Sequence, residues 1–196
     1  MLRAVLLSVS LSLVTFACAS TPKAPSAKVS LETVKPGGAV KAGGKDVNLY
    51  SGSLAVGQPI SKFVAAIGDL PKGVSVINVV PSIDTKVCEE QTHLLGESKA
   101  LDAKVQRFTV SRDLPFAQKR FADEAKLTNV SYLSDYKNGD FGKSSGLLMK
   151  GSELLARAVI VTDKEGVIRY FQVVPDVSTL PDMNKAFQLA NDLLKQ

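Results

Sequence analysis

The run "GVSVINVVPSIDTKVC", Gly73–Cys88, constrains the fold more than any other stretch of this chain. Its first half, Gly73–Val80, is rich in β-branched residues without alternation, which predicts a strand covered on both faces. A loop that starts with proline follows, and the apolar spacing after it predicts a helix. Strands buried on both faces occur in layered α/β domains, so this run predicts a sheet between two layers of helices.

The rest of the folded part alternates between strand and helix signals. Strands are predicted at 104–110 and in two hairpins, 39–52 with a turn at 43–46 and 157–174 with a polar turn at 163–166. Helices are predicted at 87–101, at 115–127 behind a proline in the first turn, and at 181–196, whereas 54–63 is predicted as a loop. This order predicts an α/β fold in three layers, with a mixed central sheet and an N-terminal β-hairpin.

The first residues have the pattern of an export signal, which we assign to 1–19. A short basic start precedes an apolar core, Ala4–Ala17, that is too short for a membrane-spanning helix. Two processing routes stay open. Small residues on both sides of Cys18 fit ordinary signal cleavage, whereas "TFAC" resembles a bacterial lipobox in which Cys18 would be lipidated. We expect an exported protein of the bacterial periplasm or cell envelope, with a lipid anchor at Cys18 favoured.

Residues 20–37 are expected to form a disordered linker. They begin with Pro, Ser, Ala and Lys in "STPKAPSAK", a composition that cannot bury enough apolar surface to fold and that suits a tether. The remaining residues, 38–196, are enough for one domain with a buried core and too few for two.

Charge and motif content exclude several classes of function. The net charge is +5, but the lysines are scattered and no basic run with interleaved aromatics occurs, so we expect no nucleic acid as a partner. His93, the only histidine, lies about 140° around the predicted helix from Cys88, which counts against a cysteine–histidine hydrolase and places His93 at the surface or an interface. One histidine and one cysteine cannot form a zinc site, and no phosphate-binding glycine loop is present, so we expect no cofactor and no metal.

Cys88 itself lies in the first turn of the predicted helix, directly after the buried strand. Free N–H groups and the helix dipole stabilise a thiolate at such a position, with Asp84 and Thr85 as candidate helix caps. A lone cysteine is more often a small core residue. However, reactive groups gather where strands lead into helices in α/β proteins, which favours a chemical role.

Three blocks carry a resemblance to a known family. Pro81, Thr85 and Cys88 form the pattern P-x-x-x-T-x-x-C, which resembles the active-site motif of peroxiredoxins. The full string "PSIDTKVC" is similar to the thiol peroxidase subfamily, as are "RDLPFAQKRF" at 112–121 and "LLARAVIVTD" at 154–163. The blocks occur in the order of that subfamily, and the resemblance implies a thioredoxin-like fold for most of the chain.

The resemblance also implies an activity, the thiol-dependent reduction of hydrogen peroxide and alkyl hydroperoxides. Cys88 would attack the peroxide and become a sulfenic acid. Thr85 would position the peroxide, and Arg157, which matches the family's catalytic arginine, would bond the thiolate and the developing oxyanion. Pro81 would shield the pocket from water.

The sequence departs from its family at one site residue. Subfamily members of the two-cysteine type carry a resolving cysteine directly after the phenylalanine of "LPFAQ.RF", and here Ala122 takes that place. This implies a one-cysteine enzyme that needs an external thiol or a thioredoxin-like reductant, and the family implies a homodimer. The alternative is a non-catalytic thioredoxin-fold protein that binds partners or senses peroxide. A thioredoxin-like reductase is disfavoured because there is no C-x-x-C pair.

Overall fold

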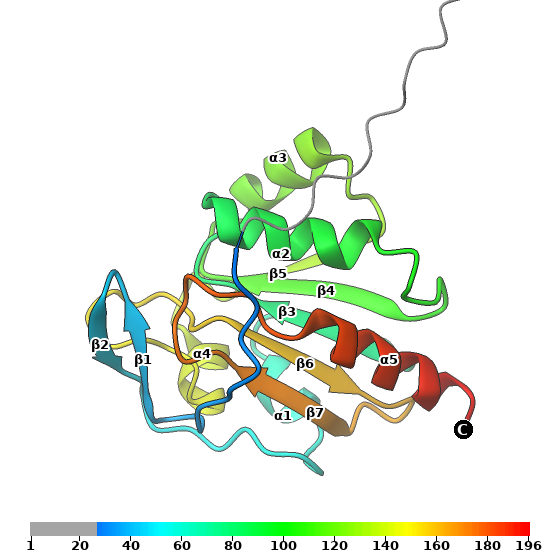
Figure 1. Cartoon of the computed structure of the whole chain (residues 1–196), viewed down its shortest axis with the longest axis horizontal. Coiled ribbons are helices and arrows are strands. Elements are labelled where there is room, and N and C mark those ends of the chain that lie inside the picture. The colour runs from blue at the N-terminus through cyan, green and yellow to red at the C-terminus, as the bar shows by residue number, and fades with distance from the viewer. Residues whose placement is uncertain (1–26) are drawn as a thin grey trace, which may run out of the picture.

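A five-stranded sheet forms the middle of the molecule in the computed structural model, which describes residues 27–196 (Figure 1). The strands lie in the order β5-β4-β3-β6-β7. β3, β4 and β5 are parallel, whereas β6 is antiparallel to both of its neighbours, so the predicted mixed sheet is confirmed. Their bounds are β3 Ser75–Val79, β4 Gln106–Ser111, β5 Ser131–Ser134, β6 Ala158–Thr162 and β7 Ile168–Val173.

Helices cover both faces of the sheet, which confirms the predicted three layers. Because side chains alternate along a strand, Val76 and Val161 pack toward α2 and α5, while Ile77 and Ile160 pack on the opposite side with α1 and α4. None of the helices in the described part of the chain is long and apolar enough to cross a membrane. The helices are α1 Ser61–Val64, α2 Lys86–Glu97, α3 Pro115–Ala125, α4 Asp140–Ser145 and α5 Met183–Leu194.

The predicted N-terminal hairpin is present as β1, Ala39–Ala42, and β2, Lys45–Asn48. Its turn uses Gly43 and Gly44 at φ angles of 56° and 77°, a left-handed conformation that glycine adopts without strain. Val40 is buried against the core below the sheet, so the hairpin forms part of the domain.

Helix α2 is shorter than predicted. The apolar spacing suggested 87–101, but the helix ends at Glu97 and Ser98 takes an extended conformation. The buried guanidinium of Arg107 donates to the carbonyl oxygens of Leu95 at 3.1 Å and Leu101 at 3.0 Å. The first bond satisfies a carbonyl group that the helix end leaves free, and the second fixes the chain beyond it, so the chain can turn here while Leu101 still reaches the core.

Short elements were missed by the sequence analysis. The segment 54–63, predicted as a loop, contains the start of α1, and both β5 and α4 were unassigned. These elements have four to six residues, too few for a clear hydrophobic period. The start of α4 is held from outside by Asp135, whose carboxylate accepts from the N–H groups of Phe141 and Gly142.

The prediction that residues 20–37 form a disordered linker is wrong for the second half of that segment. Residues 28–35 lie beside the end of β7 and the segment before α5 and lead into a turn at 36–37, drawn in blue in Figure 1. Backbone bonds join Ser30 to Leu180 at 2.8 Å and Val34 to Val173 at 2.9 Å. An edge strand offers free backbone groups that a passing segment can pair with whatever its composition, which is why composition alone misled the prediction. Residues 1–26, which include the predicted export signal and Cys18, lie outside the described part.

Candidate active site

Cys88 is the third residue of α2 and follows the carboxyl end of β3 by a short loop. Its side chain is fully buried. Val80 and Ile83 pack against it, and Phe121 of α3 packs on the same cluster. The surroundings of the sulfur are therefore apolar on the sides that these residues occupy, which excludes water and strengthens electrostatic interactions there.

Two polar groups contact the sulfur. The hydroxyl of Thr85 lies 2.9 Å from Cys88 Sγ, and Nη2 of Arg157 lies 3.3 Å from it. A guanidinium can only donate, so the sulfur of Cys88 is the acceptor in the second contact. Thr85 also occupies the N-cap position of α2, but its side chain makes no cap hydrogen bond. The predicted capping role of Thr85 is therefore wrong, because its hydroxyl is directed to the sulfur instead.

Arg157 is buried just before β6, and neutral partners fix its orientation. Its Nε donates to the carbonyl oxygen of Val177 at 2.8 Å, and its Nη1 donates to Gln91 Oε1 at 2.8 Å and Val87 O at 3.3 Å. No carboxylate within the described residues forms an ion pair with it. Its positive charge is thus directed at the sulfur of Cys88 without competition from a carboxylate.

The turn that supplies Val177 is held by Asp176. This carboxylate accepts from the backbone N–H of Ser178 at 2.8 Å and from its hydroxyl at 2.7 Å. Both bonds favour the charged form, so they hold the pKa of Asp176 below its usual range. Because Arg157 Nε bonds the residue inside this turn, Asp176 supports the orientation of the guanidinium from a distance.

The loop between β3 and α2 is held by Asp113, at the end of β4. Its two carboxylate oxygens accept from the hydroxyl of Ser82 at 2.7 Å and from the N–H of Ile83 at 2.8 Å. Pro81 is buried in this loop, whereas Thr85 is exposed. Thr85 therefore marks the side from which a small molecule can approach the buried sulfur.

The structure brings Cys88, Thr85 and Arg157 together, leaves Pro81 buried in the adjoining loop, and adds residues that the sequence analysis missed. Gln91 and Asn78 are fully buried polar side chains, on α2 and in the middle of β3. An asparagine within a β-branched run and a glutamine one turn after Cys88 were visible signals, because buried polar groups need partners. Asp113 gave no such signal, since its role depends on the meeting of two loops.

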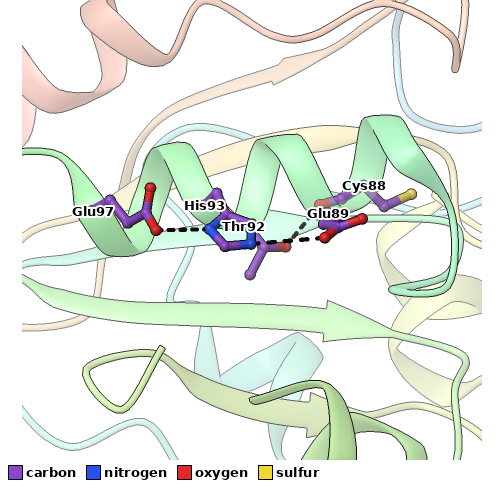
Figure 2. Close-up of polar contacts among 5 residues, drawn as sticks. All are labelled: Cys88, Glu89, Thr92, His93 and Glu97. Carbon is purple, nitrogen blue, oxygen red and sulfur yellow. Dashed lines mark hydrogen bonds and ion pairs between the residues drawn. The ribbon is translucent and has the colours of Figure 1, made fainter. Parts of the chain in front are cut away.

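His93 is on α2 but does not contact the sulfur (Figure 2). Its Nδ1 lies 2.9 Å from Glu97 Oε1, and its Nε2 lies 3.9 Å from Glu89 Oε1. The same view shows the hydroxyl of Thr92 bonded back to the carbonyl oxygen of Cys88, at 2.8 Å, while the sulfur points away from His93. The prediction that His93 lies at the surface and away from Cys88 is confirmed, since its side chain is 30% exposed.

Ala122, at the expected resolving position, is half-buried in α3. Its neighbour Phe121 is the residue that packs on the Cys88 cluster. Within residues 27–196, Cys88 is the only cysteine, and no cluster of acidic, histidine and cysteine side chains is suited to a metal ion.

Comparisons with known proteins agree with this geometry. A family model described as Redoxin matches residues 60–187. A thiol peroxidase of Oceanobacillus iheyensis is 39% identical over 144 residues, which are 69% of this chain and 88% of that protein. A thiol peroxidase of Staphylococcus saprophyticus is 44% identical over 113 residues, 58% of this chain and 68% of that protein. The crystal structure of a peroxiredoxin-like protein from Aquifex aeolicus superposes with a TM-score of 0.69 at 34% identity, covering 79% of this chain and 96% of that one.

Proposed function

The chain belongs to the Redoxin family as a thiol peroxidase of the peroxiredoxin type, and we propose that Cys88 is the one thiol with which it reduces peroxides. The observation that carries this proposal is the buried sulfur in contact with both the Thr85 hydroxyl and the Arg157 guanidinium. A cysteine that only fills space in the core does not need a buried arginine beside it that has no ion-pair partner among the described residues. The alternative, a non-catalytic binding or sensing protein, gains no support from the relatives, which are themselves thiol peroxidases.

The first step is a displacement at the peroxide oxygen. The Cys88 thiolate attacks the terminal oxygen of hydrogen peroxide or an alkyl hydroperoxide, a sulfur–oxygen bond forms and the oxygen–oxygen bond breaks. The leaving hydroxide or alkoxide takes up a proton and departs as water or an alcohol. Arg157 stabilises the negative charge on sulfur and then on the departing oxygen, and the Thr85 hydroxyl orients the incoming peroxide.

The second stage needs a thiol from outside the chain. A reductant thiol attacks the sulfenic acid at Cys88, forms a mixed disulfide and releases water. A second thiol then releases Cys88 and leaves the reductant oxidised as a disulfide. Because Ala122 cannot act as a nucleophile, a small thiol or a thioredoxin-like protein supplies both electrons.

Steady-state assays test this activity. The purified protein should consume hydrogen peroxide or a small alkyl hydroperoxide when a dithiol is supplied, and Cys88→Ser should abolish turnover. The matched double variant carries both Ser82→Cys and Cys88→Ser. It has one thiol in the loop before α2, without the Arg157 contact, and should remain inactive. Full activity in either variant would contradict the assignment.

The one-thiol cycle can be tested by restoring a thiol at Ala122. Ala122→Cys should form a disulfide with Cys88 after mild peroxide treatment, if α3 unwinds locally to close the gap. Ala125→Cys lies about one turn further along α3 and is also half-buried, so it serves as a control and should form little disulfide with Cys88. Equal disulfide yields in the two variants would show that Ala122 is not the resolving position.

We propose a homodimer that uses the surface around the start of α3. Leu114 and Phe116 are large apolar side chains with exposed fractions of 53% and 84%, and Tyr136 is 37% exposed. Pro115 and Tyr136 line one hollow of about 420 Å³. Apolar groups exposed in a cluster mark association surfaces. Phe116→Lys should convert the dimer to a monomer in sedimentation velocity, and a monomeric wild-type protein would refute the proposal.

We propose that the protein is exported to the bacterial cell envelope and anchored by lipid at Cys18. The support is the signal-like sequence before Cys18 and the polar residues directly after it. One acyl chain anchors weakly, so stable attachment requires the several chains of a lipoprotein. The intact mass of protein from its native host distinguishes lipidation from ordinary signal cleavage. A species that begins at Ser20 without acyl mass would show ordinary cleavage and contradict the proposal.

A further inference from the structure

A groove lies between α2 and the start of α5, away from the sulfur of Cys88. It has a volume of about 350 Å³, and Val29 of the N-terminal segment lines it together with the two helices. Its apolar side chains are Leu94 of α2 and Leu180, Met183 and Phe187 in and just before α5. Concave apolar surfaces with a few polar groups at their border are where proteins bind ligands or peptide segments.

The rim of this α2–α5 groove is acidic. Glu90 and Glu97 border it on α2, and Asp182 borders it at the start of α5. Glu97 contacts His93, and Asp182 accepts from the N–H of Lys185. Within the described residues, neither Glu97 nor Asp182 forms an ion pair with a lysine or an arginine. An occupant with apolar surface and a positive charge would therefore complement the groove.

The N-terminal part of the chain joins the domain at this rim. The backbone N–H of Ala27, the first described residue, donates to the two carboxylate oxygens of Glu90 at 3.4 and 3.3 Å. Two positions later, Val29 forms a parallel bridge with Leu180, another residue that lines the groove. The segment 20–26 is therefore attached to the domain at the edge of the α2–α5 groove.

The composition of residues 20–26 suits the groove. The sequence "STPKAPS" has no acidic residue and one basic residue, Lys23, between Pro22 and Pro25. A segment of this kind cannot form a core of its own, but it can bind to a groove that is already formed. Prolines favour the extended polyproline II form, so the segment loses little conformational freedom when it binds.

The length of the segment fits as well. In polyproline II form, residues 20–26 reach roughly 20 Å, whereas α2 rises only about 12 Å from Glu90 to Ser98. We propose that residues 20–26 bind in the α2–α5 groove, with their prolines against its apolar side chains and Lys23 beside its acidic rim. A lipid anchor at Cys18 would then hold this face of the domain near the membrane. The proposal does not depend on the peroxidase activity, and its tests use no peroxide.

Nuclear magnetic resonance of the chain that begins at Ser20 tests this binding. The backbone order parameters of Lys23 and Ala24 should be about 0.85, as in rigid backbone, and not below about 0.6, as in flexible chains. Protons of the two prolines should show nuclear Overhauser contacts to Leu94 or Phe187. Order parameters below 0.6, or an ordered segment without contacts to the groove, would overturn the proposal. Contacts that grow with protein concentration would indicate the segment of a second copy and would overturn it too.

Substitutions at Lys23 test the match of charge. Lys23→Glu reverses the charge beside the acidic rim, so the Overhauser contacts to the groove should weaken about twofold or more, as expected for one ion pair at the surface. Lys23→Arg keeps the charge and should keep the contacts at wild-type intensity. Contacts of equal intensity in the two variants would overturn the placement of Lys23 at the rim.

A positive charge placed in the groove tests the same contact from the other side. Asn184 is exposed and lines the groove, so Asn184→Arg should repel Lys23 and weaken the contacts about twofold or more. Gln188→Arg is the matched control, because Gln188 is also exposed on α5, about one turn further along, and does not line the groove. The control should keep the wild-type contacts. Equal losses in both variants would show a general effect of charge and overturn the proposal.

Discussion

At the scale of single residues, the site depends on the burial of Arg157. A lone arginine at the start of a strand is usually solvated, and its sequence context alone would not predict its 2% exposure. The resemblance predicted its role, and the structure adds how the charge is tolerated, through bonds to carbonyl and amide oxygens rather than to a carboxylate. The cost of burying this charge is offset by those bonds and by a thiolate at Cys88.

Thr85 offers a prediction at the same scale. Thr85→Val keeps the shape but removes the hydroxyl that lies 2.9 Å from Cys88 Sγ. The rate of reaction with peroxide, measured by stopped flow, should fall by a factor on the order of 10², as for the loss of one oriented hydrogen-bonding group. Thr85→Ser keeps the hydroxyl and should stay within several-fold of the wild type. Equal losses in the two variants would point to packing rather than hydrogen bonding.

At the scale of elements, the sequence predicted the parts whose signal is local. The β-branched run gave β3, and the proline at the start of α3 gave that helix boundary. The position of Cys88 between a strand and a helix was also a local signal, whereas Pro81, Thr85 and Arg157 were singled out by the family resemblance. Gln91 left a local signal, a polar residue one turn after Cys88, that the sequence analysis did not use. Asp113 was missed because it bonds a loop about 30 residues away in the sequence, and no local pattern encodes such a meeting.

The turn at Asp176–Thr179 gives a prediction about pH. Hydrogen bonds from Ser178 lower the pKa of Asp176, so its contribution to stability is present above the usual aspartate value of about 4 and is lost as the pH falls through the lower value in the folded protein. Asp176→Asn should therefore be less stable than the wild type at neutral pH. The difference should shrink toward zero in acid, as measured by urea denaturation over a series of pH values. A difference independent of pH would contradict this account.

At the scale of the whole molecule, the segment 28–37 connects the region before α5 to the hairpin β1–β2. It bonds Leu180 and Val173 through the backbone, and the side chain of Gln172 donates to the carbonyl oxygens of Ser30 and Glu32. Through Val173 this segment occupies the end of the outer edge of β7, where backbone groups would otherwise be open to pairing with another chain. The domain therefore begins about ten residues earlier than composition indicates.

Truncation tests this boundary. A chain that begins at Ala27 keeps the whole segment and serves as the reference. A chain that begins at Gly38 loses several hydrogen bonds of about 1 kcal/mol each, and a total of about 3 kcal/mol lowers the Tm by roughly 10 °C for a domain of this size. Thermal unfolding followed by circular dichroism would show this, and equal Tm values for the two chains would mean that the segment adds no stability.

The central claim is that Cys88 is the only residue that peroxide oxidises in the reaction. Trapping the sulfenic acid at Cys88 tests that claim most directly. Protein that begins at Ser20 is treated with an equimolar amount of hydrogen peroxide in the presence of dimedone, which reacts with sulfenic acids, and is then analysed by peptide mass spectrometry. The account predicts a dimedone adduct on Cys88 in the wild type and its loss in Cys88→Ser, with no intramolecular disulfide. A chain without any adduct at Cys88, or with a disulfide between Cys88 and Cys18 in the full-length protein, would contradict it.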